Sequence, residues 1–224
     1  MNEETSDFQR LLVACDEVSH EYPDGVVYIG GIAVYMHAIN HPRTQQYAES
    51  THDADFYISL SDMGDLRDAE EVVPNRRLSK HQMMRDGFEF DIYTERQSGL
   101  IVPYDAVMAS ANKYEAFRVA GLEHLLVLKL EAYRDRRQSA KGQKDAKDIF
   151  RIAMLAAEGD GQFNWALAAP YLSDEHFSLL DEVRRGAAAV NLARGNAKTA
   201  KAMRATIERL MAQHRAVKGH RDED

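Results

Sequence analysis

The chain has 224 residues, of which 45% are hydrophobic and 29% charged, and its net charge is −8. This length suits one large domain or two small ones, and the composition is that of an ordinary globular protein. No apolar run approaches the roughly 20 residues that cross a bilayer, and residues 1–10 are too acidic and polar for a signal peptide. Cys15 is the single cysteine, which excludes an intrachain disulfide, so we expect a cytoplasmic protein that does not bind a membrane.

The charge is unevenly distributed along the chain. Residues 1–128 contain 10 Lys and Arg against 22 Asp and Glu, a net of −12, whereas residues 129–224 contain 18 against 14, a net of +4. The overall acidity argues against a general nucleic-acid coat. A local basic surface on the C-terminal half is compatible with these counts, and so is an ordinary solvated helical face.

The first predicted elements are a strand and a helix joined by paired glycines. Residues 26–29 are β-branched and aromatic and predict a strand, Gly30-Gly31 predicts a tight turn, and the apolar residues 32–39 predict a helix. His41-Pro42 ends that helix, because the residue before a proline disfavours helical backbone. The polar residues 43–51 predict a loop.

Three further strands are predicted after this loop. Residues 53–59 alternate between polar and apolar and predict a strand. An Asp-Gly turn at Asp86-Gly87 predicts a hairpin between strands 79–84 and 88–94. Because strand side chains alternate, Glu89, Asp91 and Tyr93 should share one face of the second hairpin strand, with Phe88, Phe90 and Ile92 on the other.

The pattern becomes helical after about residue 120. Residues 122–137 predict an amphipathic helix, Lys141-Gly142 predicts a break, and residues 144–157 predict another helix. Residues 161–224 are rich in Ala, Leu, Arg and Glu and predict more helices, most clearly over 197–216. We therefore expect an α/β domain over residues 1–120 and an all-helical domain over residues 121–224.

Asp53, Asp55 and Asp91 are the candidate catalytic residues. Asp53 and Asp55 are two apart on one strand, so their carboxylates share a face and repel each other unless a cation lies between them. If the strand of Asp91 is a neighbour, all three carboxylates converge, and oxygen ligands of this kind suit Mg²⁺ or Mn²⁺ in a two-metal site. The alternative is the ordinary polar face of a half-buried sheet, although Asp is disfavoured in strands.

Gly30-Gly31 and His52 carry weaker signals. Glycines at a helix start let the backbone approach a phosphate, although a plain tight turn is the commoner role of such a pair. His52 next to Asp53 could indicate a His-Asp metal hydrolase. That chemistry needs further histidines on neighbouring helices, whereas this pair lies on a predicted strand.

These motifs together resemble the DNA polymerase β superfamily of nucleotidyltransferases. The resemblance rests on the strand, Gly30-Gly31 and helix, on Thr51-His52-Asp53-Ala54-Asp55-Phe56, and on the later strand with Asp91. The segment Leu122 to Arg137 and the following Lys144-Asp145-Ala146-Lys147-Asp148 resemble the C-terminal motifs of AbiEii-type and MenT-type nucleotidyltransferases. Many of those proteins are toxins of toxin–antitoxin systems, and the resemblance covers roughly residues 26–155.

The resemblance implies a nucleotidyltransferase core with a mixed sheet and a set of site residues. It makes Asp53, Asp55 and Asp91 the metal ligands and catalytic residues. It also implies nucleotide contacts for Gly30, Gly31, Thr51, Lys129, Asp145 and Asp148. Two positions depart from the family pattern: Ile32 replaces the frequent Ser or Thr after the glycines, and Glu49 stands where Arg is common.

Lys129 interrupts an apolar run on a predicted helix, so its ammonium must reach solvent or meet an anion. Asp145 and Asp148 are three apart and share a helix face, where they could pair with Arg136, Arg137 or Lys144. The resemblance implies that one of the two supports Lys129 or the nucleotide.

The predicted activity is transfer of a nucleoside monophosphate from an NTP to a hydroxyl group, with release of pyrophosphate. The resemblance to toxins points to the 3′ end of tRNA as acceptor, with protein side chains as another option, and to a cognate antitoxin as a partner. Alternatives are a small-molecule nucleotidyltransferase of the antibiotic-modifying sort and a degenerate, non-catalytic nucleotide-binding regulator. If the acceptor is RNA, three basic residues near one face of the last predicted helix should hold its phosphates: Lys198, Lys201 and Arg209.

Overall fold

The computed structural model describes residues 3–96, 98–158 and 163–221. The chain divides into two compact units. The first comprises Met1–Asn40 and Ala48–Gly121, and the second comprises His41–Tyr47 and Leu122–Asp224.

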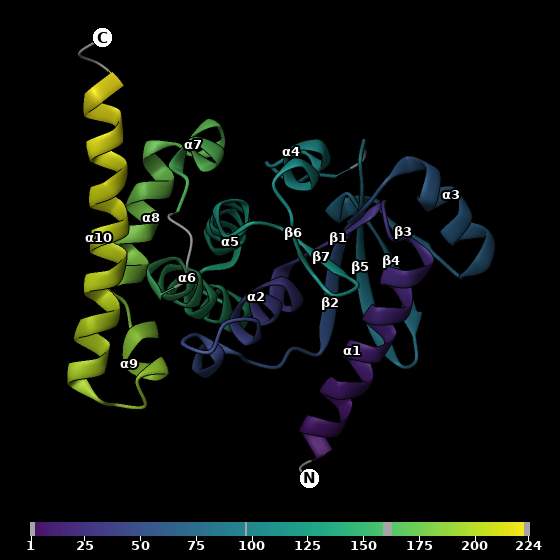
Figure 1. The fold of residues 1–224 in the computed structure, drawn as a ribbon, viewed down its shortest axis with the longest axis horizontal. Helices are drawn as coiled ribbons and strands as arrows, with labels where there is room; N and C mark the ends of the chain where they lie inside the picture. Colours follow the sequence, from purple (N-terminus) through teal and green to yellow (C-terminus); the bar gives the residue numbers. More distant parts are fainter. Residues whose placement is uncertain (1–2, 97, 159–162, 222–224) are drawn as a thin grey trace. The chain divides into compact units, whose positions relative to one another are not determined.

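The first unit contains a mixed sheet and four α-helices among its described residues (Figure 1). The strand order is β3-β4-β5-β2-β1-β7-β6. The strands β2 and β5 are parallel, as are β1 and β7, and the other neighbouring pairs are antiparallel. In chain order the elements are α1 (Glu3–Glu21), β1 (Val26–Ile29), α2 (Gly30–Ile39), β2 (Asp53–Ile58), α3 (Leu60–Ala69), β3 (Val73–Asn75), η2 (Arg76–Leu78), β4 (Lys80–Arg85), β5 (Phe88–Thr94), α4 (Tyr104–Ala109), β6 (Asn112–Tyr114) and β7 (Phe117–Val119).

One face of this sheet forms the core of the first unit. Phe56, Phe90 and Ile92 lie on it, and each is fully buried. Helix α1 crosses this region of the sheet (Figure 1) and contributes the buried Leu11, Cys15 and Val18 from one helical stripe. Burying large aromatic and branched side chains on a shared face is the main favourable term in assembling such a unit.

The opposite face is covered at one end and carries the carboxylates toward the other. At the covered end, Tyr57 lies in ring contact with Tyr93 and with Tyr104 of α4, and its hydroxyl donates to the carbonyl of Val102. Asp55 precedes Tyr57 by two residues on β2, toward the start of that strand. The strand period of two therefore places the acidic side chains on the half of this face that lies beyond the tyrosines.

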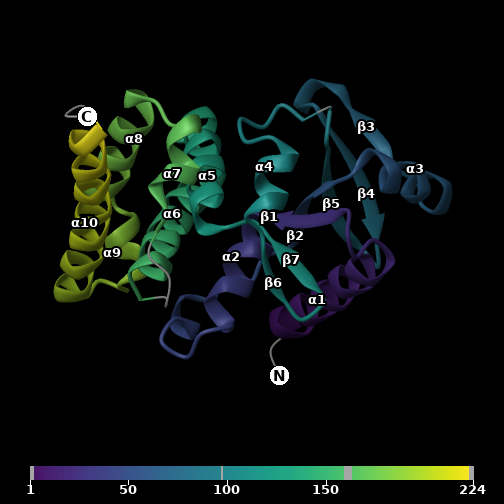
Figure 2. The ribbon, with the colours of Figure 1, turned by 45° about the horizontal axis from the view of Figure 1, so that its top comes forward.

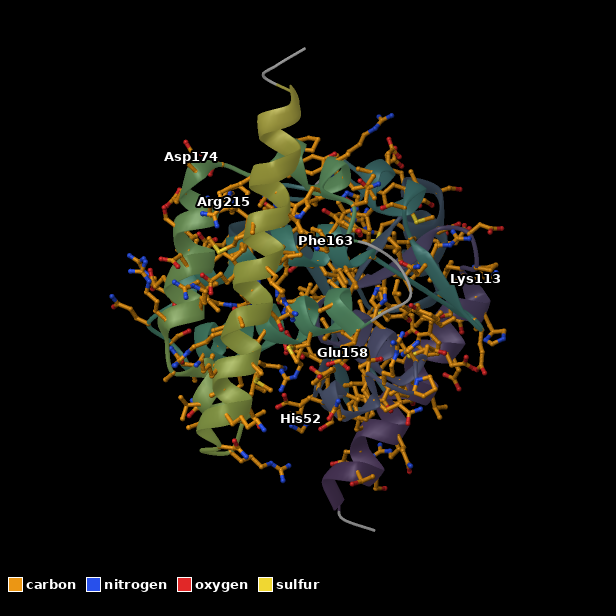
Figure 3. All side chains as sticks on the ribbon, turned by 60° about the vertical axis from the view of Figure 1, so that its left-hand side comes forward. His52, Lys113, Glu158, Phe163, Asp174 and Arg215 are labelled. Carbon is orange, nitrogen blue, oxygen red and sulfur yellow. The ribbon has the colours of Figure 1, made fainter. Side chains whose placement is uncertain are left out.

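Among its described residues, the second unit contains helices and connecting segments but no strand (Figure 2). The long helices α5 and α6 pack against each other, and α10 packs against α6, α8 and α9. Figure 3 looks onto α10, with Asp174 marking the start of α8 and Arg215 on α10 itself. The elements are η1 (Gln45–Tyr47), α5 (Leu122–Arg136), α6 (Ala140–Glu158), α7 (Trp165–Ala168), η3 (Ala169–Tyr171), α8 (Asp174–Arg185), α9 (Ala188–Leu192) and α10 (Ala197–Arg221).

The structure confirms the predicted class, an α/β part with a mixed sheet followed by helices, and it corrects one boundary. Lys141-Gly142 was predicted to break the chain between helices, but both residues lie inside α6, which begins at Ala140. The break comes earlier, at residues 137–139, where the Ser139 hydroxyl accepts from the backbone N–H of Gly142. Gly142 is glycine for another reason: a Cβ there would lie 2.2 Å from the carbonyl oxygen of Arg136, so only glycine lets the two helices approach this closely.

No helix within the described ranges is both long enough and apolar enough to cross a membrane.

Candidate active site

The predicted carboxylates lie side by side on neighbouring strands. Asp53 and Asp55 are on β2, and β2 pairs in parallel with β5, so that Asp55 stands directly opposite Asp91. Neighbouring strands are about 4.8 Å apart, and partners in register point to the same side of the sheet. The structure thus brings the three aspartates together on one face, where all three are half-buried.

Paired glycines bound this face at the junction of β1 and α2. Gly30 has φ of +69°, in the left-handed region that glycine adopts without strain. Its backbone lies against Asp55, because Ile29 is the antiparallel partner of Asp55, and a Cβ at Gly30 would lie 2.2 Å from the Oδ2 of Asp55. Glycine at position 30 is therefore required both by its backbone conformation and by the space that Asp55 fills.

Thr51 supports the first aspartate. Its buried hydroxyl donates to the Oδ1 of Asp53 at 2.7 Å. A Cβ at Gly31 would lie 3.0 Å from the Thr51 side chain, so the second glycine leaves room for this threonine. His52 is exposed and lies in a bend directly before β2, which begins at Asp53.

Two residues of β4 bind the third aspartate, and the sequence interpretation missed both. The ammonium of Lys80 forms an ion pair with the Oδ2 of Asp91, and the amide of Gln82 donates to its Oδ1 at 3.1 Å. The signal was present in the hairpin. A two-residue Asp-Gly turn pairs Arg85 with Phe88, and that register places Gln82 opposite Asp91.

The side chains present fit a divalent cation at the β2 pair. Carboxylate oxygens facing one side of a strand are the donors that Mg²⁺ and Mn²⁺ prefer. Across the described ranges, no group of three or more His, Cys, Asp or Glu side chains is arranged to hold a metal ion. Asp91 is bound by Lys80 and Gln82 instead. A metal ligand role for Asp91 therefore stays a prediction.

Lys129, Asp145 and Asp148 form a second polar group, within the helical unit. The Lys129 ammonium lies 2.6 Å from the Oδ2 of Asp148 and 3.4 Å from the Oδ1 of Asp145. Each aspartate also binds an arginine, Asp145 to Arg136 at 2.7 Å and Asp148 to Arg151 at 2.8 Å. Burial lowers the pKa of Arg151 to about 10, so its guanidinium still carries a positive charge at neutral pH. Asp148 compensates this poorly hydrated charge.

The contacts of Asp145 and Asp148 answer a question that the sequence left open. The aspartates were expected to pair either with the nearby basic residues or with Lys129, and both kinds of pair are present. Lys129 lies on α5, and both aspartates lie on α6. Their carboxylates compensate the positive charge that Lys129 places within an apolar run.

Lys198, Lys201 and Arg209 are exposed on α10. The opposite side of this helix is buried through Ala200, Met203, Ile207 and Leu210. Three arginines of the C-terminal half are bonded within the protein. Arg184 and Arg185 pair with Asp181, and Arg204 donates to the carbonyl of Gly186 at 3.1 Å.

Comparison with known proteins identifies the fold. No family model matches the sequence, and no curated protein matches it. A solved structure of a candidate nucleotidyltransferase from Helicobacter pylori superposes with a TM-score of 0.51 and 13% identity, covering 97% of this chain and 99% of that one. This chain has a nucleotidyltransferase-like fold.

Two further solved structures share less of the fold. JHP933 from Helicobacter pylori has a TM-score of 0.47 at 15% identity and covers 97% of this chain and 99% of its own. An antigenic nucleotidyltransferase-like protein from Paracoccidioides brasiliensis has a TM-score of 0.46 at 15% identity and covers 88% of this chain and 93% of its own. Sequence identities this low support a shared fold only, and the activity must be argued from the site.

Proposed function

We propose that this protein transfers a nucleoside monophosphate from an NTP to a hydroxyl acceptor and releases pyrophosphate. The observation that carries the proposal is the placement of Asp53, Asp55 and Asp91 on one sheet face of a nucleotidyltransferase-like fold. Gly30 and Gly31 adjoin these carboxylates at the start of a helix. Backbone N–H groups at a helix start attract a phosphate, so the triphosphate and the carboxylates would meet at one place.

In the proposed reaction the acceptor oxygen attacks the α-phosphorus of the NTP. The bond between that phosphorus and the oxygen bridging to the β-phosphate breaks, pyrophosphate leaves, and the acceptor proton passes to a carboxylate or to water. Catalysis of this kind rests on positioning and on stabilising negative charge. Mg²⁺ or Mn²⁺, held by Asp53 and Asp55, would supply positive charge beside the reacting phosphate when bound.

Lys129, Asp145 and Asp148 enter the proposal through resemblance alone. A lysine that contacts the nucleotide phosphates would have to exchange part of its bonding with Asp145 and Asp148 for the phosphate. Thr51 has a clearer role, because its hydroxyl fixes an oxygen of Asp53. We propose Thr51 as a positioning residue for the first carboxylate.

For the acceptor, we propose the 3′ end of tRNA, within a toxin-like activity that a cognate antitoxin would restrain. The exposed lysine and arginine side chains on α10 suit the binding of a polyanion better than that of an amino sugar. Protein side chains and small antibiotic-like molecules are the competing acceptors.

The test uses each α-labelled NTP in turn, with Mg²⁺ or Mn²⁺ and with tRNA, total RNA or protein as acceptor. The parent chain should label RNA, and EDTA should abolish labelling without unfolding the protein. Asp53→Asn and Asp55→Asn should fold and lose labelling by about a hundredfold or more, since each removes charge at the reacting phosphate. Asp68→Asn, an exposed aspartate of α3, is the matched control and should keep parental labelling.

A non-catalytic nucleotide-binding regulator is the second candidate. Two observations favour it: Glu49 departs from the family pattern, and Ile32 is fully buried, so position 32 packs the core and offers no hydroxyl to a phosphate. NTP binding without labelling of any acceptor, in the same assay, would select this function.

A further inference from the structure

The carboxylate face continues beyond Asp91 over β4 and β3, at one edge of the sheet. Gln82 stands opposite Asp91, and Val73 stands opposite Gln82, so these three side chains point to one side of the sheet. Met84 follows Gln82 by two residues on β4 and shares that side. Val73 is 54% exposed and Met84 is 63% exposed, so this part of the face is open to solvent and to a ligand.

The turn between β3 and β4 carries two arginines, in a unit that is otherwise strongly acidic. The first unit contains 9 Lys and Arg against 21 Asp and Glu. Most of these basic side chains are bonded within the protein, namely Arg10, Lys80, Arg85 and Arg118 in ion pairs and Arg67 to His81. Arg76 and Arg77 are exposed in η2, and neither pairs with an acidic side chain of residues 3–96, 98–158 or 163–221. Two adjacent guanidinium groups without a carboxylate partner suit a ligand that carries phosphate.

A chain of hydrogen bonds ties this turn to the third carboxylate. Asn75 precedes η2, and its Oδ1 accepts from the backbone N–H of Leu78 at 3.3 Å. The NH₂ group of Asn75 donates to the Oε1 of Gln82 at 3.1 Å. The NH₂ group of Gln82 donates in turn to the Oδ1 of Asp91 at 3.1 Å and to the Oε1 of Glu89 at 2.5 Å. The turn with the arginines is therefore held in a fixed place beside the carboxylates.

The proposed reaction sets the side from which an acceptor reaches the α-phosphorus. The attacking and leaving oxygens lie roughly in line, on opposite sides of the phosphorus. The proposed triphosphate site at Gly30 and Gly31 lies on the β1 side of the carboxylates, whereas the strand order places β4 and β3 on the other side (Figure 2). Because pyrophosphate leaves toward the glycines, the acceptor approaches over β4 and β3.

We propose that the edge formed by β3, η2 and β4 is the acceptor subsite, and that it binds the 3′-terminal nucleotides of a single-stranded polynucleotide. Arg76 and Arg77 bind backbone phosphates, and Val73 and Met84 contact unstacked bases or riboses. Strand β3 lies two strand spacings from β5, about 10 Å, so a hydroxyl beside Asp91 and phosphates at η2 fit the last few nucleotides of one strand. The subsite rests on the proposed nucleotidyl transfer for the direction of the acceptor, and it adds the class of the acceptor and its contacts.

The test measures binding of a short, fluorescently labelled single-stranded RNA to the full chain by anisotropy, across a salt series and without NTP. Arg76→Gln/Arg77→Gln should weaken binding about tenfold and reduce the slope of log K against log salt by about 1.4, since each phosphate contact on a single strand contributes about 0.7. Arg76→Lys/Arg77→Lys should keep most of the slope, because both charges remain. Lys113→Gln/Lys141→Gln, an equal loss of charge at exposed positions of β6 and α6, should keep the parental affinity and slope (Figure 3 labels Lys113).

Met84→Ser gives an independent test of the apolar contact. It should weaken RNA binding several-fold at every salt concentration and leave the salt slope unchanged, because an apolar contact releases no ions. Val13→Ser is the matched control, since Val13 is 60% exposed on α1, and it should bind RNA as the parent does. Circular dichroism spectra of all these variants should match that of the parent, because each substituted side chain is exposed.

Equal affinity and equal salt slope in the parent and in Arg76→Gln/Arg77→Gln would overturn the inference. A parent chain that binds an acidic peptide and not the RNA would also overturn it, in favour of a protein acceptor. The binding measurement needs no turnover, so it is separate from the labelling assay. If NTP labels a protein and the RNA does not bind, the transfer stands and the subsite fails. If the RNA binds as expected and NTP labels no acceptor, the RNA surface stands and the transfer fails.

Discussion

Gly30 links backbone conformation to the carboxylate site more directly than any other glycine of the first unit. Gly30→Ala should destabilise the protein by about 1–2 kcal/mol, because an L-residue pays this cost in the left-handed region. It should reduce transfer activity further than its stability loss explains, since the new Cβ displaces the carboxylate of Asp55. Urea unfolding and the labelling assay measure the two effects separately.

Gly64→Ala is the matched control for this substitution. Gly64 lies inside helix α3, and a Cβ there meets no atom within 4 Å, so alanine should stabilise by up to about 1 kcal/mol and leave activity unchanged. Parental activity in a folded Gly30→Ala variant would show that the close approach of Gly30 and Asp55 has no part in the reaction.

Single residues also show where the sequence was sufficient and where it was not. The alternation around Asp53, Asp55 and Asp91 predicted one shared face, because the strand period depends only on local backbone geometry. The contact of Gly30 with Asp55 could not be predicted, since it depends on the antiparallel pairing of β1 with β2. Lys80 was predictable from the hairpin register, but a lysine in a short polar strand carries no signal until that register is applied.

The ion network between α5 and α6 ties two helices of the second unit together. Lys129→Met leaves Asp148 with Arg151 and Asp145 with Arg136, but removes the cation that the two aspartates share. Breaking a buried ion pair on one side typically costs about 3 kcal/mol, so we expect a clear fall in the unfolding midpoint in urea. Lys141→Met, at an exposed position of α6, is the control and should be nearly neutral.

The double variant Lys129→Met/Asp145→Asn completes this test. Removing both charges should recover part of the lost stability, because Asp148 keeps its buried ion pair with Arg151, and Arg136, which loses Asp145, is partly exposed. If Lys129→Met is as stable as the parent but binds NTP more weakly, the network is not structural and Lys129 serves the nucleotide alone.

His37 couples helix α2 to the end of the first unit and makes its stability depend on pH. The ring is buried and bonded through Nε2 to the carbonyl of Ala120 at 2.8 Å and through Nδ1 to the hydroxyl of Tyr114 at 2.9 Å. These partners suit a neutral ring that donates to the carbonyl and accepts from the hydroxyl. Burial lowers the pKa of His37 below its ordinary value of 6.5.

Because the folded pKa lies below 6.5, the unfolded chain binds more protons in the interval between the two values, and stability rises with pH there. The contribution of His37 should therefore be complete above pH 6.5 and be lost as the pH falls below it. His37→Gln should flatten this fall in urea midpoints measured from about pH 8 to pH 5, whereas His20→Gln, exposed on α1, should not. An equally steep pH dependence in His37→Gln would assign the effect to other groups.

The helices show how composition can hide periodicity. Helix α1 was not predicted, because its first residues are acidic and polar, although Phe8, Leu11, Cys15 and Val18 repeat at helical spacing and are all buried. Gly142 was misread as a break, because a glycine required by helix–helix contact looks the same in sequence as one that ends a helix. For Gly142 the missing information is tertiary, whereas for α1 the helical spacing was present in the sequence.

The two units differ in charge, and this difference bears on the acceptor. The sheet unit, which holds the carboxylates, contains 9 Lys and Arg against 21 Asp and Glu, whereas the helical unit contains 19 against 15. A fold shared at 13% identity says nothing of the acceptor, so the surface must decide. On α10, Lys198, Lys201 and Arg209 lie near one side, because steps of three and eight residues add up to about three helical turns.

If RNA is the acceptor, these three basic side chains should hold its phosphates. Changing Lys198, Lys201 and Arg209 to Glu should raise the KM for RNA several-fold and lower the salt dependence of RNA binding, because each lost phosphate contact reduces the number of ions released. The KM for NTP should stay near the parental value, since the proposed triphosphate contacts Gly30 and Gly31 lie in the other unit.

A control with the same change in net charge, placing Glu at the exposed Arg96, Lys113 and Lys141, separates this local effect from general repulsion of RNA. RNA labelling across a salt series is the measurement. If the α10 variant and the control have the same KM and the same salt slope, this face does not bind RNA, and a protein or a small molecule becomes the leading acceptor.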